Sequence, residues 1–284
     1  MPRRAPAPLT RTLALAALLV GPLAACKGSA AESQQPTADQ GPQSVAEIKD
    51  WKQRVAIENQ EVQRKDPALH QQLTTLQAKA GPGGAPTFEE PIVENNPDAS
   101  PVLITRLMSG GESKENHQAI AEALPRAGGD WQEPAAALIP LQAEPEVRQA
   151  LVESMRYAEP PHIVEGLKAG FRDESPAVQA AAARTAGFSK YGGMLYSELL
   201  SSLFADDWDV RAASAQSLGK LKMREATSAL RRSLGDEHEQ VRLYALLALE
   251  RIDPEGVKTF PEVAKLRQDP SNAVATEANR LSPQ

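Results

Sequence analysis

The chain has 284 residues and a formal net charge of −6, with 31 lysines and arginines against 37 aspartates and glutamates. An acidic chain with no basic block is a poor candidate for binding nucleic acid or an anionic lipid surface by electrostatics. Only 4% of the residues are aromatic, and alanine and leucine dominate the second half. This composition favours closely packed helices over a sheet core.

The first 25 residues are typical of a cleaved targeting signal. A segment with three arginines and no acid precedes an apolar run over residues 12–25, which is shorter than a membrane-spanning helix of about 20 residues. The run ends in Leu-Ala-Ala-Cys, and Cys26 is the only cysteine of the chain. This stretch resembles the lipobox of bacterial lipoproteins, in which the signal is cut before the cysteine and the sulfur carries a diacylglyceryl group.

The lipobox resemblance implies a lipid on Cys26, acylation of the new amino terminus with a fatty acid such as palmitate, and no other cofactor. More than one acyl chain is needed for stable anchoring, which this pattern would supply. Lys27 follows the cysteine, and in a cell with two membranes a residue other than aspartate there implies the outer membrane, facing the periplasm. The alternative is a cysteine that merely follows a cleaved signal. Loss of the three signal arginines leaves 28 basic and 37 acidic residues, a net charge of −9.

Two stretches have the composition of linkers. Residues 26–43 are polar and lack apolar periodicity, so we expect a flexible tether next to the lipid anchor. Residues 81–97 are rich in glycine and proline and are expected to link two folded parts. The large apolar residues of this linker are Phe88, Ile92 and Val93, which we expect to dock on a neighbouring element.

The segment between these linkers, residues 44–80, predicts two helices, about 44–65 and 67–79. Ser44 precedes a glutamate by three residues and fits a capping box. Asp66, followed by proline, is typical of a second helix start. Apolar residues recur every seven positions, but the second seam position is mostly polar. The pattern therefore favours helices laid against the next domain over a self-associating stalk.

From residue 98 to the end the chain repeats itself. An acidic turn, then Val-Arg and a run of small residues ending in leucine, recurs at intervals of 31–33 residues. A pair of helices cannot bury its apolar face alone, so we expect residues 98–284 to form an all-α solenoid of six stacked two-helix units. The alternative is one irregular helical bundle. The residues in the valine position are Asn116, Val147, Val178, Val210, Val241 and Val274.

The best copy, VRAASAQSLG at 210–219, resembles the HEAT-like repeat of the phycobilin-lyase type. The resemblance implies a right-handed solenoid whose second helices line the concave face. It also implies that the arginines after the valines, Arg148, Arg211 and Arg242, bond the acidic turns of adjacent units. Three copies depart from the pattern at this position and carry His117, Gln179 and Ala275.

No motif indicates catalysis. Proteins that resemble these repeats include bilin lyases and an iron-dependent hydroxylase, but the hydroxylase needs several His-Glu pairs and this chain has one, His238-Glu239. The four histidines lie in separate elements without metal-ligand spacing. We therefore expect no metal site and no enzymatic activity.

Binding is the function that a solenoid favours, because its stacked units present an extended surface. The repeat geometry implies that certain second-helix positions face outward, among them the alanines 180, 181, 212 and 213. We hypothesise an apolar anchor for a partner with arginines at its flanks and an aromatic contact in a turn. The alternative is that the last unit or the linker covers the anchor. The residues of this hypothesis are Leu243, Tyr244 and Leu247 for the anchor, Arg184 and Arg280 for the flanks, and Trp208 for the turn contact.

Together these patterns predict a lipid-anchored, non-catalytic scaffold or adaptor that binds one or more envelope proteins or peptides, and no nucleic acid. Two alternatives stay open. One is an accessory or modifying factor of the lyase-like HEAT-repeat kind. The other is a structural spacer in an envelope complex.

Overall fold

The computed structural model describes residues 48–281 except 89 and 90. The expected signal, Cys26, the tether and the Ser44 cap lie outside the described residues. The described residues belong to one compact unit. None of the helices in the part that the structure describes is long and apolar enough to cross a membrane.

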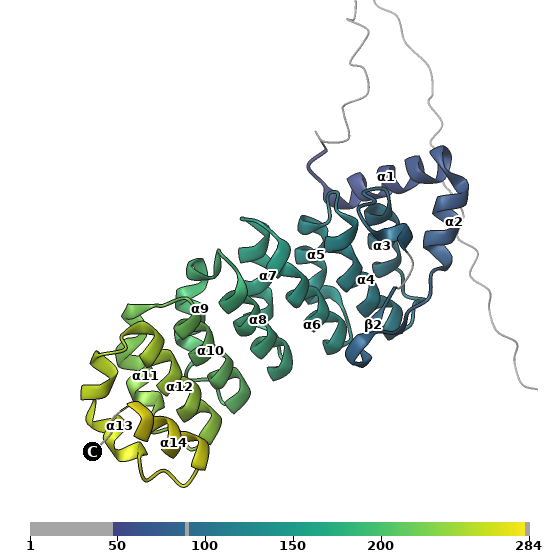
Figure 1. The fold of residues 1–284 in the computed structure, drawn as a ribbon. Helices are drawn as coiled ribbons and strands as arrows, with labels where there is room; N and C mark the ends of the chain where they lie inside the picture. Colours follow the sequence, from purple (N-terminus) through teal and green to yellow (C-terminus); the bar gives the residue numbers. More distant parts are fainter. Residues whose placement is uncertain (1–47, 89–90, 282–284) are drawn as a thin grey trace, which may run out of the picture. The chain divides into compact units, whose positions relative to one another are not determined.

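Consecutive helix pairs stack along this unit from residue 99 to residue 281 (Figure 1). The first helices of the pairs are α3 (Ala99–Leu107), α5 (Gln132–Leu138), α7 (His162–Phe171), α9 (Tyr196–Ser202), α11 (Thr227–Ser233) and α13 (Pro261–Leu266). The second helices are α4 (Lys114–Ala127), α6 (Pro145–Ser154), α8 (Pro176–Phe188), α10 (Trp208–Lys220), α12 (Glu239–Ile252) and α14 (Asn272–Leu281). Each second helix packs on the second helix of the next pair. The predicted all-α solenoid is confirmed, with one helix pair for each sequence copy.

Short 3₁₀ segments complete the connections between these helices. They are η4 (Ile139–Leu141), η5 (Met155–Tyr157), η6 (Gly192–Leu195), η7 (Arg224–Ala226) and η8 (Gly256–Thr259).

The acidic or polar turns start the second helices. The Asp207 carboxylate accepts hydrogen bonds from the backbone N–H groups of Asp209 and Val210, and so caps α10. Pro145 and Pro176 occupy the first turns of α6 and α8. The backbone N–H that proline lacks would have no partner within the helix at this position. Helices that begin at fixed points place the repeat valines on the core side. The valines at 147, 178, 210, 241 and 274 are at most 1% exposed.

Small residues let the second helices approach one another closely. A Cβ added at Gly219 of α10 would lie 2.6 Å from Cα of Ala248 on α12. The expectation that the alanines of α8 and α10 face outward is wrong, because helices this close bury them between each other. Their exposed fractions lie between 0% and 4% for Ala180, Ala181, Ala212 and Ala213.

Two helices precede the solenoid and pack on its first pair. They are α1 (Trp51–Lys65) and α2 (Pro67–Thr75), and both contact α3. Residues 48–50 are not helical, so α1 begins later than predicted, because Asp50 caps it by accepting from the N–H of Lys52. Asp66 caps α2 with proline in its first turn, as predicted. Arg54 of α1 pairs with Asp130 and Glu133 at the start of α5.

The glycine- and proline-rich segment folds onto the first units. Strands β1 (Lys79–Ala80) and β2 (Pro86–Thr87) pair antiparallel around η2 (Pro82–Gly84), and η3 (Pro91–Val93) follows. This small sheet was not predicted. Gly83 and Gly84 have φ values of 83° and 86°, which favour glycine in this turn. Phe88 and Val93 are buried in the core, and Ile92 packs against it.

Candidate functional site

Two rows of accessible side chains run along the second helices. They lie six and ten residues after the valine position, one helical turn apart, and all of them are exposed or half-buried. We call these rows the second-helix face. The six-residue row is Glu122, Glu153, Arg184, Gln216, Leu247 and Arg280, and the ten-residue row is Arg126, Tyr157, Phe188, Lys220 and Arg251.

The first two units place two glutamates on the second-helix face, near Arg126 of the ten-residue row. A groove of about 420 Å³ lies between α4 and α6, and its lining includes Glu122 and Glu153. Neither carboxylate has an ion pair among the residues that the structure describes. Tyr157 borders the groove with 61% of its surface exposed, and the Arg156 guanidinium lies 5.0 Å from its ring centroid. This end of the face therefore combines carboxylates and guanidiniums with an accessible aromatic ring.

The later units make the face cationic and apolar. Phe188 at the end of α8 is 70% exposed. The Lys220 ammonium lies 3.4 Å from the centroid of its ring. Arg251 projects from the last turn of α12 and is exposed. The sequence interpretation missed Phe188, Lys220 and Arg251, although their common ten-residue offset from the repeat valines could have revealed them.

The predicted apolar anchor is only partly accessible. Leu243 and Tyr244 are half-buried and pack against the core, and Leu247 is half-buried as well. The expectation that these side chains are exposed is wrong, because their neighbours in the fold cover part of each of them. Tyr244 and Leu247 still line a small hollow of about 30 Å³, which they share with Gln216, Ala248 and Arg251.

The two predicted flanking arginines are already engaged. Arg184 pairs with Asp209 of the next unit through Nη1, at 3.1 Å. Arg280 pairs with Glu250 of α12 at 2.6 Å and donates from Nε to Glu277. Its hydrogen bonds to Glu277 and Glu250 raise the pKa of the Arg280 guanidinium. Both side chains connect units in this structure.

Trp208, the predicted turn contact, lies at the other end of α10 from Lys220. Its ring stacks on His238, the residue that precedes α12, with centroids 3.9 Å apart and planes at 11°. Trp208 is 38% exposed. The stack joins two consecutive turns and leaves part of the indole accessible.

The three arginines that follow repeat valines bridge successive acidic turns. Arg148 donates from Nε and Nη2 to the Asp173 carboxylate at 2.7 and 3.0 Å, and from Nη1 to two carbonyls of its own turn. Arg211 and Arg242 make the same contacts with Asp236 and Asp269. These hydrogen bonds raise the pKa of each guanidinium against the opposing effect of burial.

The bridge is absent where the arginine is replaced. The Gln179 amide donates to the carbonyl of Asp173 in its own turn at 2.6 Å, and no bond to the next turn is found for it. Beside His117 a hollow of about 530 Å³ lies between the first two turns, with Leu107, Leu138 and Val147 in its lining. A hollow of the same volume lies beside the intact Arg211–Asp236 bridge, so such space between turns is not peculiar to the replaced position.

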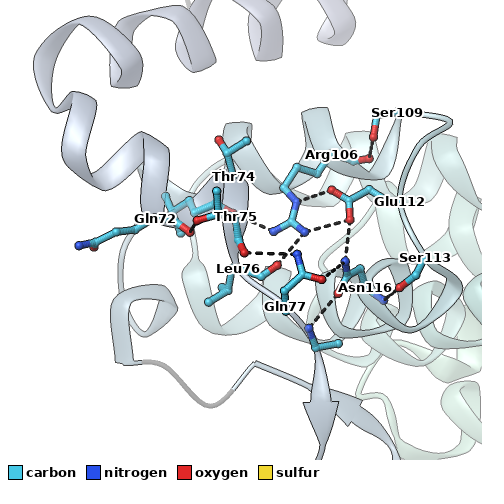
Figure 2. Close-up of polar contacts among 12 residues, drawn as sticks. Gln72, Thr74, Thr75, Leu76, Gln77, Arg106, Ser109, Glu112, Ser113 and Asn116 are labelled. Carbon is cyan, nitrogen blue, oxygen red and sulfur yellow. Dashed lines mark hydrogen bonds and ion pairs between the residues drawn. The ribbon is translucent and has the colours of Figure 1, made fainter.

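A buried arginine attaches α2 to the first pair (Figure 2). Arg106 of α3 donates to the carbonyls of Leu73 and Leu76 at 2.8 Å each, and to both carboxylate oxygens of Glu112. Asn116 occupies the valine position, and its side-chain oxygen accepts from the N–H of Ala78 at 2.8 Å. The first copy departs from the repeat because it must hold the end of α2.

Among residues 48–88 and 91–281, no group of three or more His, Cys, Asp and Glu side chains could hold a metal ion.

Comparison with known proteins agrees with the repeat architecture. Residues 196–281, which span the last three helix pairs, match the family of HEAT repeats. The match does not distinguish the phycobilin-lyase type from other HEAT repeats. No curated protein matches the chain. Residues 196–281 therefore carry HEAT repeats, and the second helices of the earlier pairs pack on one another in the same way.

Two solved structures that match the chain are designed proteins. One is the designed armadillo repeat protein YIII(Dq)4CqI, at 18% identity and a TM-score of 0.41, with 64% of this chain and 98% of that chain covered. The other is the designed armadillo repeat protein YIII(Dq.V1)4CPAF in complex with peptide (KR)4, at 18% identity and a TM-score of 0.39, with coverage of 76% and 97%.

Proposed function

We propose that this chain is a non-catalytic protein-binding scaffold or adaptor, held in the cell envelope by a lipid on Cys26. The repeat solenoid supports binding in general, because stacked units present one long surface to a partner. The envelope location is supported by the Leu-Ala-Ala-Cys stretch alone, and Lys27 favours the outer membrane of a two-membrane cell.

The observation that carries the binding proposal is the exposure of aromatic rings on the second-helix face. Tyr157 and Phe188 occupy the same position in successive units and are 61% and 70% exposed. Folding does not require aromatic residues there, since other units carry Arg126, Lys220 and Arg251 at this position. Accessible aromatic rings are typical of surfaces that bury themselves against a partner.

Site-specific photo-crosslinking in the producing cell tests this face. A photoreactive phenylalanine analogue replaces Tyr157 or Phe188 in the full chain, and in a control it replaces Ser201, which is exposed on the first helix α9. We expect discrete crosslinked protein bands from the two face positions and none from the control. A spacer would crosslink equally from all three positions or from none, and either result would reject the proposed face.

The anchor has its own test. The full chain should incorporate radiolabelled palmitate and fractionate with the outer membrane of a two-membrane producing cell. The Cys26→Ser variant should lose the label and the membrane association. A labelled Cys26→Ser variant, or an unlabelled native chain, would refute the lipid anchor without affecting the binding proposal.

A further inference from the structure

We propose that Phe188, Gln216, Lys220, Leu247 and Arg251 form a cationic patch that binds an acidic segment of a partner protein, in which an aspartate or glutamate adjoins an apolar side chain. This inference rests on the proposed binding function and adds the chemistry of the partner.

Ion pairs between consecutive units are common along the solenoid. They join Arg148 to Asp173, Lys168 to Glu198, Arg184 to Asp209, Arg211 to Asp236, Arg231 to Glu262, Arg242 to Asp269 and Arg280 to Glu250. Lys220 and Arg251 lie on consecutive second helices in the same way, yet neither has an ion pair in the part of the chain that the structure describes. The patch thus has two positive charges and no carboxylate between them.

The contacts inside the patch place these two cations around one polar group. The Lys220 ammonium donates to Oε1 of Gln216 at 3.3 Å. Gln216 and Arg251 line the same small hollow. Partial burial and then the charge of Arg251 lower the pKa of Lys220, so its ammonium is less stabilised than it would be in water. A carboxylate placed between the two side chains would offset both effects.

The location of Lys220 and Arg251 at helix ends explains only in part why the patch has this composition. Each lies in the last turn of a second helix, where the helix dipole favours a positive charge. That effect accounts for a cation on each helix. It does not account for the ring of Phe188, which stays 70% exposed while Lys220 covers part of it.

The shape of the patch indicates an apolar group beside the carboxylate. The hollow of about 30 Å³ next to Arg251 is walled partly by Leu247 and Tyr244, and it suits a methyl-sized group. Phe188 offers an aromatic surface on the other side of Lys220. The guanidinium of Arg251 can bind a carboxylate with two parallel hydrogen bonds. An acidic residue next to leucine, isoleucine or phenylalanine would supply both the carboxylate for Arg251 and the apolar group beside it.

The charge of the whole chain makes this attraction local. A net charge of −9 after loss of the signal disfavours the approach of an acidic segment from a distance. At physiological ionic strength charges are screened beyond about 8 Å, so the two cations dominate at contact. Binding should therefore weaken as salt is added.

Panning a library of random dodecapeptides on the full chain in detergent tests the proposal without a known partner. We expect selected peptides to combine aspartate or glutamate with an adjacent large apolar residue. A fluorescein-labelled selected peptide should bind the Lys220→Gln/Arg251→Gln variant about tenfold more weakly than the native chain. This variant should fold normally, because it removes two cations that have no ion pair.

The matched control is Arg172→Gln/Lys265→Gln, which removes the same charge from exposed sites on the first-helix layer. It should bind as the native chain does. The proposal is overturned if no peptide is selected, if the selected peptides lack an excess of acidic residues, or if both double variants bind equally. Crosslinks from Phe188 together with any of these results would keep the scaffold function and reject only the acidic partner chemistry.

Discussion

Arg211 on α10 and Asp236 in the turn before α12 join consecutive units through two hydrogen bonds, from Nε at 2.8 Å and from Nη2 at 2.9 Å. The remaining nitrogen, Nη1, donates to the carbonyls of Ala205 and Asp206 in its own turn. One planar guanidinium therefore fixes the spacing of two turns. A lysine could not replace it, because an ammonium lacks this fork geometry.

Removing this arginine should destabilise the solenoid strongly. Arg211 is only 8% exposed, so Arg211→Met leaves the Asp236 carboxylate poorly solvated and without its partner. We expect a loss of about 3 kcal/mol in the free energy of unfolding, measured by urea denaturation followed by circular dichroism.

The matched control is Arg231→Met, which breaks the pair of Arg231 with Glu262. That pair also joins consecutive units, but its side chains are 37% and 38% exposed. Its loss should be at most about 1 kcal/mol. Equal losses in the two variants would contradict the structural role assigned to Arg211.

The same bridges predict a loss of stability in acid. Burial opposes ionisation of Asp236, but hydrogen bonds from Arg211 and from the N–H of His238 outweigh it and lower the pKa of this carboxyl. The pKa of Asp269 is lowered in the same way. The unfolded value is about 3.9, so the contribution is complete above about pH 5 and is lost as pH falls through the lower folded value.

Urea midpoints measured between neutral pH and about pH 3 check this sign. The native chain should lose stability mainly below about pH 4. The Asp236→Asn variant, which has one lowered carboxyl fewer, should be less stable at neutral pH and should decline less in acid. Parallel curves for the two proteins would show that Asp236 does not contribute to the acid sensitivity.

Restoring the repeat valine in the first copy should destabilise the protein. Valine fills this position in five other copies, but Asn116 accepts from the Ala78 N–H and donates to Gln77 and Glu112 (Figure 2). Asn116→Val leaves the part-buried N–H of Ala78 without its acceptor and removes one donor to the Glu112 carboxylate, and we expect a loss of about 1–3 kcal/mol in urea denaturation. Gln77→Ala, which deletes only one of these bonds at an exposed residue, should change stability far less. A stabilised Asn116→Val chain would refute this account.

The solenoid was predictable because its core depends on local, repeated signals. The turn that starts α10, the buried Val210 and the small residues after it recur at nearly constant spacing, and each signal acts within one helix pair. The cap of α2 at Asp66 was predictable for the same reason. The start of α1 was not, since the sequence offers more than one possible cap and the helix that the structure describes is capped by Asp50.

The second-helix face was harder to predict because the exposure of its side chains depends on contacts between units. Ala180 and Ala212 have outward positions on an isolated helix, but the neighbouring second helices bury them. Arg184 was expected to be available, yet it meets Asp209 of the next unit. The two-stranded sheet rests on two residues in each strand, too few for an alternation pattern. The sequence shows that Asn116 departs from the repeat. The reason for the departure is its hydrogen bonds with Gln77 and Ala78, which follow α2.

The close contact of α10 and α12 makes a final prediction in which two opposing effects compete. In a helix interior, glycine to alanine normally stabilises by about 1 kcal/mol. At Gly219 the new Cβ would lie 2.6 Å from Cα of Ala248, a backbone atom that cannot rotate away. The two helices must separate, and the repacking that follows costs about 1–3 kcal/mol. We therefore expect Gly219→Ala to destabilise the chain in urea denaturation despite its better helix propensity.

Gly110→Ala provides the comparison, because a Cβ there meets nothing within 4 Å. It should leave stability unchanged or raise it by about 0.4–1 kcal/mol, since alanine restricts the unfolded chain. Hydrogen exchange should show faster opening of α10 and α12 in Gly219→Ala and no change in Gly110→Ala. Equal or greater stability in Gly219→Ala would mean that α10 and α12 are not held at this distance. It would contradict the close packing of the second helices on one another.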